Sequence, residues 1–119
     1  MNKQQWKRKI KKACNDTGTY RKSFESVIDT LAQIMENRDL AQEQFEASGS
    51  NPVIMHTNKG GNTNLVKNPA LVMVNDLNAT ALSYWRDLGL TPSGFKKLGE
   101  SLTVKKESSF EDLLAGIGV

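Results

Sequence analysis

The sequence is poor in the residues that build covalent or metal-bound frameworks. Its 119 residues include one cysteine, Cys14, and one histidine, His56. A single cysteine excludes an intrachain disulfide, and this pair alone cannot form a Cys/His zinc site within one chain. Long apolar runs are also missing, and no apolar segment follows the basic N-terminus as it would in a secretion signal. We therefore expect a protein that neither spans a membrane nor is secreted.

Features that could support catalysis are weak. The chain length suits one modest core without a deep active site. Gly60 and Gly61 could cradle a phosphate, but the ending of a P-loop is absent, and a flexible loop is the simpler interpretation. Acid pairs such as Asp76 and Asp87 could hold a divalent ion, although solvated helix faces explain them better. We expect no enzymatic activity, no cofactor and no metal site.

Positive charge is concentrated at the N-terminus. Residues 1–22 carry eight basic side chains and one acidic side chain, a net charge of +7, whereas residues 23–119 carry a net charge of −4. A basic segment on an acidic remainder is typical of proteins that bind a polyanion, most often nucleic acid. We expect residues 1–19 to form a DNA-binding arm, against the alternatives of a solubilising tail or a membrane-surface helix.

The lysines and arginines of this segment would neutralise phosphates. The Trp6 indole would either stack on a base or pack beneath the arm. The residues expected to contact DNA are Lys3, Trp6, Lys7, Arg8, Lys9, Lys11, Lys12, Arg21 and Lys22.

A long amphipathic helix is predicted over residues 20–45, where apolar residues recur at intervals of three and four. The opposite face, including Glu25, Asp29 and Asp39, is expected to stay in solvent. Arg38 occupies an apolar position, where it sets register, pairs with an acid of a neighbouring subunit or extends to solvent. The residues expected at an oligomer interface are Phe24, Val27, Leu31, Ile34, Arg38 and Phe45.

A second helix is predicted from Asn68-Pro69 to Gly89, because asparagine suits the N-cap, proline the first turn and glycine the C-cap. A short helix over residues 92–98 should follow, capped by Thr91. Residues 56–64 lack periodicity and connect the two long helices as a flexible loop or an ordered crossing. We expect an all-α fold, with an antiparallel helical hairpin and short helices in an oligomerisation core of residues 20–100.

Residues 101–119 begin as a polar linker and end in a short amphipathic helix. A helix of about ten residues is marginal alone in water, so it needs a partner to dock on. Its apolar face consists of Phe110, Leu113, Leu114 and Ile117.

One stretch resembles a known family. Asn68-Pro69 begins a helix that ends in Leu88-Gly89-Leu90-Thr91-Pro92-Ser93, and Phe95-Lys96-Lys97-Leu98 follows. This pattern is similar to phage terminase small subunits of the P27 family, and the resemblance covers roughly residues 20–100. The chain departs from the pattern at Gly94-Phe95, where the family commonly has an arginine after the serine.

The resemblance implies a non-enzymatic component of viral DNA packaging. Such a protein binds double-stranded viral DNA, assembles into a ring of about eight to ten subunits, and recruits and regulates the large-subunit ATPase-nuclease. It would act in the host cell cytoplasm. The terminal Phe110–Ile117 helix lies outside the matching stretch, and our own hypothesis is that it docks on the large subunit. The alternatives are a small dimeric helical DNA-binding regulator, a metal-dependent nuclease and an adaptor that binds only protein.

Overall fold

The computed structural model describes residues 1–100, so the linker and docking helix expected in residues 101–119 lie outside the described residues. Of the described residues, 69% are helical and 10% lie in strands. A last helix occupies residues 92–100. The preceding elements are α1 (Lys3–Thr17), a 3₁₀ turn (Lys22–Phe24), α2 (Glu25–Ala47), β1 (Val53–Thr57), β2 (Thr63–Lys67) and α3 (Pro69–Asp87).

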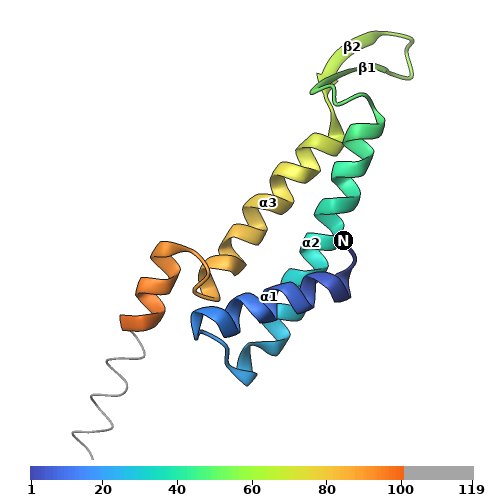
Figure 1. Cartoon of the computed structure of the whole chain (residues 1–119). Coiled ribbons are helices and arrows are strands. Elements are labelled where there is room, and N and C mark those ends of the chain that lie inside the picture. Colours follow the sequence, from blue (N-terminus) through green and yellow to red (C-terminus); the bar gives the residue numbers. More distant parts are fainter. Residues whose placement is uncertain (101–119) are drawn as a thin grey trace, which may run out of the picture.

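The two long helices α2 and α3 form the expected antiparallel hairpin (Figure 1). The apolar positions predicted on α2 face the interior, where Ile28, Leu31 and Met35 are buried. The helix begins at Glu25 instead of residue 20, because the preceding residues form the 3₁₀ turn. It ends just before Gly49, whose φ of 90° suits a residue without a Cβ atom.

The predicted boundaries of α3 are confirmed by its caps. The Asn68 side chain accepts a hydrogen bond from the Ala70 backbone N–H at 3.0 Å, and Pro69 occupies the first turn. At the start of the next helix the Thr91 hydroxyl accepts a hydrogen bond from the Gly94 N–H at 3.1 Å. Both caps satisfy backbone donors that a helix start leaves without intrahelical partners.

Gly94 also explains the departure from the family pattern. A Cβ atom at this position would lie 2.2 Å from the Arg86 carbonyl oxygen of α3. The last helix therefore crosses the end of α3 at a distance that only glycine permits. An arginine at position 94 does not fit this packing.

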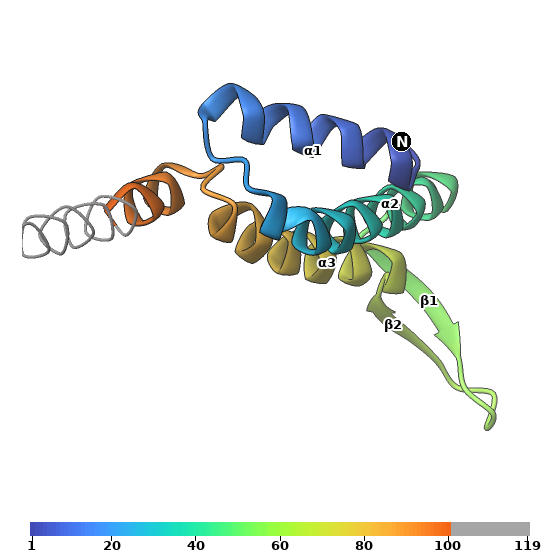
Figure 2. The same cartoon turned by 90° about the horizontal axis from the view of Figure 1, so that it is seen from below.

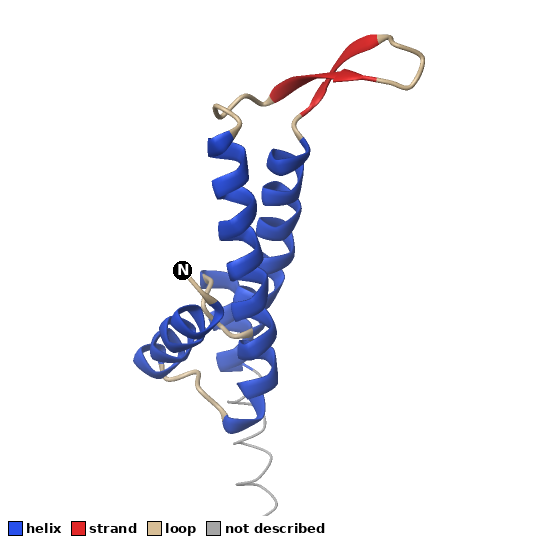
Figure 3. Cartoon of the chain, turned by 90° about the vertical axis from the view of Figure 1, so that its right-hand side faces the viewer, coloured by secondary structure: helices blue, strands red, loops and turns tan. Residues whose placement is uncertain are grey.

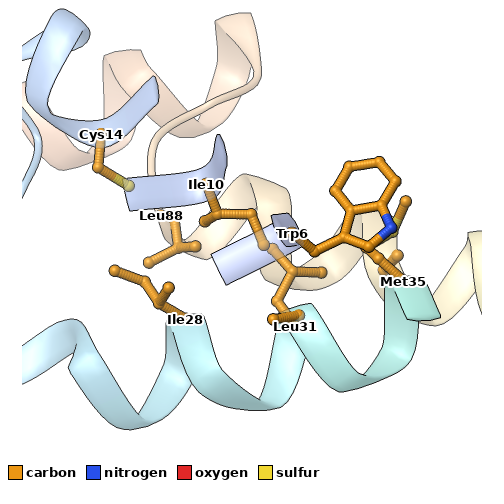
Figure 4. Packing of buried hydrophobic residues seen from close by; sticks show 9 residues of the cluster. Trp6, Ile10, Cys14, Ile28, Leu31, Met35 and Leu88 are labelled. Carbon is orange, nitrogen blue, oxygen red and sulfur yellow. The ribbon is translucent and has the colours of Figure 1, made fainter. Parts of the chain in front are cut away.

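The core lies where α1 crosses α2 and the end of α3 (Figures 2 and 4). Ile28, Leu31, Met35 and Ala32 of α2 meet Ala81 of α3. Figure 4 shows the labelled side chains converging between these helices, with the Trp6 ring beside Met35. Tyr84 and Trp85, which helical spacing assigned to the core, pack against this cluster as partly buried residues. The remaining members of the cluster are Trp6, Ile10, Cys14 and Leu88.

The all-α expectation was incomplete, because residues 56–64 lie within a β-hairpin in which residues 58–62 form the turn between β1 and β2. β1 and β2 pair antiparallel and project beyond the helices (Figure 3). Asn58 orders the turn: its side-chain oxygen accepts hydrogen bonds from the N–H groups of Gly60 and Asn62, both at 3.0 Å. β-branched residues on either side of a glycine-containing loop are the signal that could have predicted the hairpin.

Residues 1–19 do not form a separate arm. They fold into α1, which packs on α2, because Trp6, Ile10 and Cys14 recur at intervals of four and form one apolar stripe. The Asn2 side chain caps the helix in a reciprocal capping box with Gln5. The basic segment is therefore part of the core-forming unit.

Candidate nucleic-acid interface

The cations of α1 fall into two groups. On one flank of the apolar stripe, Lys3, Lys7 and Lys11 are spaced four residues apart and lie against α2. Lys3 and Lys7 each contact Asp29, with Nζ to carboxylate distances of 3.1 and 3.4 Å. Lys11 Nζ lies 2.8 Å from a Glu25 carboxylate oxygen. These three predicted DNA contacts therefore have acidic partners on α2 within the chain.

The ionisation of these groups agrees with that pairing. The hydrogen bond from Lys11 lowers the pKa of Glu25 below its ordinary value, and the hydroxyl of Tyr20 also donates to this carboxylate. The hydrogen bond from Lys3 likewise lowers the pKa of Asp29. The pKa of Lys11 is raised by its hydrogen bond to Glu25. Glu25, Asp29 and Lys11 therefore stay ionised at neutral pH.

The second group faces away from α2. Within residues 1–100, Arg8, Lys9, Arg21 and Lys22 are exposed and form no ion pair. Lys12 pairs with Asp16 at 2.8 Å on the exposed surface, a contact of little energy that a phosphate can replace. These side chains form the basic outer face of α1 and of the turn after it.

Of the two predicted roles for Trp6, stacking on a base and packing beneath the helix, the structure shows packing. It is 7% exposed, and its indole N–H donates to Asp39 at 2.7 Å. The face of its ring is flanked by two cations, with Lys9 Nζ 5.0 Å and the Arg38 guanidinium carbon 5.9 Å from the ring centroid. In this position the indole cannot stack on a base.

Asp39 connects the start of α1 to α2. Its carboxylate accepts a hydrogen bond from the Met1 ammonium at 2.8 Å, in addition to the one from the Trp6 indole. It also contacts an Arg38 nitrogen at 3.1 Å. Burial raises the pKa of Asp39, but the hydrogen bonds from the ammonium and the indole outweigh it, so the pKa lies below its ordinary value. Arg38 thus pairs with its own neighbour in sequence, and its buried Nε has no hydrogen-bond partner among the described residues.

The expected oligomer-interface residues lie largely inside this chain. Leu31 is fully buried, and Phe24, Val27 and Ile34 pack against the core as partly buried residues. Phe45 is partly buried near the end of α2. The apolar seam of α2 is covered by α1 and α3, which the sequence pattern alone did not indicate.

Sequence reasoning also missed the role of the acidic residues on α2. Glu25, Asp29 and Asp39 were expected in solvent, but they hold α1, and a Glu36 carboxylate oxygen accepts the Lys3 backbone N–H at 2.6 Å. The sequence does contain a signal for this pairing: the lysines of α1 are four residues apart, and so are Glu25 and Asp29 of α2. That signal becomes visible only when the two helices are known to pack together.

The other candidate features are accounted for within the chain. The turn N–H groups that might have cradled a phosphate donate to Asn58, including Gly61 N–H to its carbonyl oxygen at 3.0 Å. His56 is exposed on β1, opposite Asn64. No cluster of three or more His, Cys, Asp or Glu residues suited to a metal occurs in residues 1–100. None of the helices in this part combines the length and apolar character needed to cross a bilayer.

Comparison with known families identifies the chain. The family model described as phage terminase, small subunit, matches residues 2–103, which includes α1 as well as the helical hairpin. Searches of curated proteins and of solved structures gave no significant match. Because the family model covers most of the sequence, the chain belongs to the family of phage terminase small subunits.

Proposed function

We propose that this chain is the DNA-recognition and regulatory component of a phage packaging motor, within the P27 branch of its family. In this role it binds double-stranded viral DNA, assembles with copies of itself into a ring of about eight to ten subunits, and recruits the large-subunit ATPase-nuclease. Members of the family are generally non-catalytic. The host cell cytoplasm is the compartment in which this function would be performed.

The observation that supports DNA binding is the set of unpaired cations on the outer face of α1 and of the turn after it. Arg8, Lys9, Arg21 and Lys22 have no acidic partner within residues 1–100, so each can neutralise a phosphate without first breaking an ion pair. Lys3, Lys7 and Lys11 would have to leave Asp29 and Glu25 to do so. In a ring, one copy of this face per subunit would convert weak phosphate contacts into avid binding.

A charge-matched pair of variants tests this proposal. Arg8→Ala/Lys9→Ala and Lys3→Ala/Lys7→Ala each remove two positive charges from α1. We expect the first variant to reduce the slope of log affinity against log salt concentration for duplex DNA by about two, because about one unit is lost per phosphate contact. The second variant should keep nearly the wild-type slope and unfold at a lower urea concentration. Equal loss of slope in both variants would contradict the assignment of the outer face.

We further propose that residues 108–119 recruit the large subunit. The support is the sequence pattern alone, in which Phe110, Leu113, Leu114 and Ile117 share one face of a short helix suited to a groove on a partner. Deletion of residues 108–119 should abolish stimulation of the large-subunit ATPase and leave the salt slope of DNA binding unchanged. Full stimulation by the truncated protein would refute the assignment.

A further inference from the structure

The side of α1 directly opposite its buried apolar stripe carries a row of polar side chains. Four exposed residues of α1 are spaced four, four and three residues apart, so they share one side of the helix. They are offset by two residues from the buried stripe, which corresponds to a rotation of about 200° around the helix axis. We call these residues the outer stripe: Gln4, Arg8, Lys12 and Asn15.

Most hydrogen-bonding groups of the outer stripe are unused within the chain. Within residues 1–100 the side chains of Gln4, Arg8 and Asn15 form no hydrogen bond or ion pair. Lys12 pairs with Asp16, whereas the neighbouring Gln5 side chain caps the start of α1 and lies outside the stripe. The two amides and the guanidinium therefore make no polar contact that stabilises the fold of these residues.

These side-chain types match the base edges that DNA presents in its major groove. An arginine can donate two hydrogen bonds to O6 and N7 of guanine, and an asparagine or glutamine amide can pair with N6 and N7 of adenine. Lysines alone would supply charge without this geometry. A row of amide and guanidinium groups on one side of a helix is thus suited to reading a sequence as well as to neutralising a backbone.

The position of α1 leaves the outer stripe accessible. The helix lies along one side of the α2–α3 pair, and no other element of residues 1–100 covers its outer side (Figures 2 and 3). A helix with its side chains is about 10–12 Å wide, which fits a major groove of about 12 Å. From Gln4 to Asn15 the helix rises about 16 Å, the length of about five base-pair steps.

The charge around the stripe favours duplex DNA as the occupant. Residues 1–22 have a net charge of +7, and Asp16, which pairs with Lys12, is their single acidic residue. Lys9 on the flank of the stripe and Arg21 and Lys22 in the turn after α1 are exposed without an acidic partner in the described part of the chain. Such an excess of positive charge complements the closely spaced phosphates of a duplex.

We propose that α1 lies in the major groove of duplex DNA and that Gln4, Arg8 and Asn15 are specificity-determining residues. Gln4 and Asn15 would select adenine and Arg8 would select guanine, while the surrounding cations hold the phosphates. This inference rests on the proposed DNA binding and adds sequence readout to it. The Arg8 guanidinium lies close to phosphates in either role, so its removal lowers the salt slope whether it contacts a phosphate or a base.

The closing experiment separates base readout from phosphate contact. The full chain selects its preferred duplex from a random-sequence library, and its affinity for this duplex is compared with that for a shuffled duplex of the same composition. Arg8→Lys keeps the positive charge but removes the planar guanidinium, and Gln4→Ala and Asn15→Ala remove uncharged amides. Asn78→Ala is the matched control, because Asn78 is exposed on α3. All four positions are exposed, so circular dichroism should show an unchanged fold.

We expect each α1 variant to lower the preference for the selected duplex by about tenfold. Each should keep the wild-type slope of log affinity against log salt concentration, because no charge is lost. Asn78→Ala should keep both properties. The bound chain should also protect guanine N7, which lies in the major groove, from methylation by dimethyl sulfate. A wild-type preference in all three α1 variants, or unprotected guanine N7, overturns the inference.

The remaining outcomes are also decisive. If wild type binds the selected and shuffled duplexes equally, base readout is refuted and the proposed DNA binding stands. If wild type binds neither duplex, the proposed function fails together with this inference. If the three α1 variants weaken binding of the large subunit and keep the wild-type DNA preference, the outer stripe contacts protein and the inference is wrong.

Discussion

The two ends of the helical hairpin differ in how they bury their apolar residues. At the end near Gly89, the chain supplies its own cover, because α1 and residues 92–100 pack on α2 and α3 and leave Leu88 1% exposed. At the other end no helix of residues 1–100 covers the β-hairpin, and Met55, Leu65 and Met73 remain exposed. One end of the molecule is therefore covered by this chain, and the other end leaves large apolar side chains exposed.

The largest difference between the two ends should appear when the same leucine-to-alanine change is made in each. Leu31 is fully buried, whereas Leu65 is 70% exposed. We expect Leu31→Ala to lower the free energy of unfolding by about 3–4 kcal/mol, because it removes buried methyl groups and leaves a cavity. Leu65→Ala should change it by less than about 0.5 kcal/mol in dilute protein. Urea denaturation measures both values, and similar losses would show that the hairpin end is also packed within the chain.

The close packing of the covered end can be tested at two positions of the last helix. A Cβ atom at Gly94 would meet the Arg86 carbonyl oxygen, whereas the Lys96 side chain is exposed. Gly94→Ala should destabilise the protein by about 2–3 kcal/mol through overpacking. Lys96→Ala should change its stability by less than about 0.5 kcal/mol, as substitutions at exposed positions usually do. Equal thermal midpoints for the two variants would contradict the observed crossing.

The attachment of the projecting hairpin depends on Asn68, which is buried at its base. Its side-chain amide donates to the Ser48 hydroxyl at 2.8 Å and to the Asn51 carbonyl at 2.9 Å, while its oxygen caps α3. Asn68→Ala should lower the free energy of unfolding by about 2 kcal/mol, through the lost cap and an unsatisfied carbonyl. Hydrogen exchange should show faster opening of the hairpin than of α1. Uniform acceleration would indicate that the hairpin and the core unfold as one unit.

The smallest expected effect is the pH dependence of the contact between α1 and α2. Glu25 and Asp29 have pKa values lowered by folding, so their stabilising contribution is present above the unfolded pKa and is lost as the pH falls through the folded pKa. The stability difference between wild type and Glu25→Gln/Asp29→Asn should therefore shrink once the pH falls below about 4. Urea midpoints measured from pH 7 to pH 3 test this, and a difference that is independent of pH would exclude an ionic origin.

Most of the helical framework could be predicted from local sequence. The alternating spacing of apolar residues located α2, and Asn68-Pro69, Gly89 and Thr91-Pro92 located the boundaries of α3 and the last helix. These signals are reliable because caps and periodicity act within one or two helical turns. The hairpin was missed because its two strands are only five residues each, too short for a clear alternation.

The candidate DNA interface was predicted only in part. The concentration of positive charge at the N-terminus follows directly from the residue count. The division between Lys3, which pairs with Asp29, and Arg8, which pairs with no acid in residues 1–100, does not. Sequence spacing places these residues on different sides of α1, but only the packed structure shows which side contacts α2.

The sequence alone therefore determined α2, α3 and the helix over residues 92–100, most of their ends and the location of the basic charge, since these depend on propensity, capping and composition. Only the tertiary structure decided that α1 belongs to the core, that the seam of α2 is covered within the chain, and that Met55 and Leu65 of the β-hairpin remain exposed. The reason is that an apolar stripe favours burial and a charge favours pairing, but neither specifies which residues will cover the stripe or pair with the charge. Leu31 is buried and Met55 is exposed because of how the whole chain packs, which the local sequence around each residue does not specify.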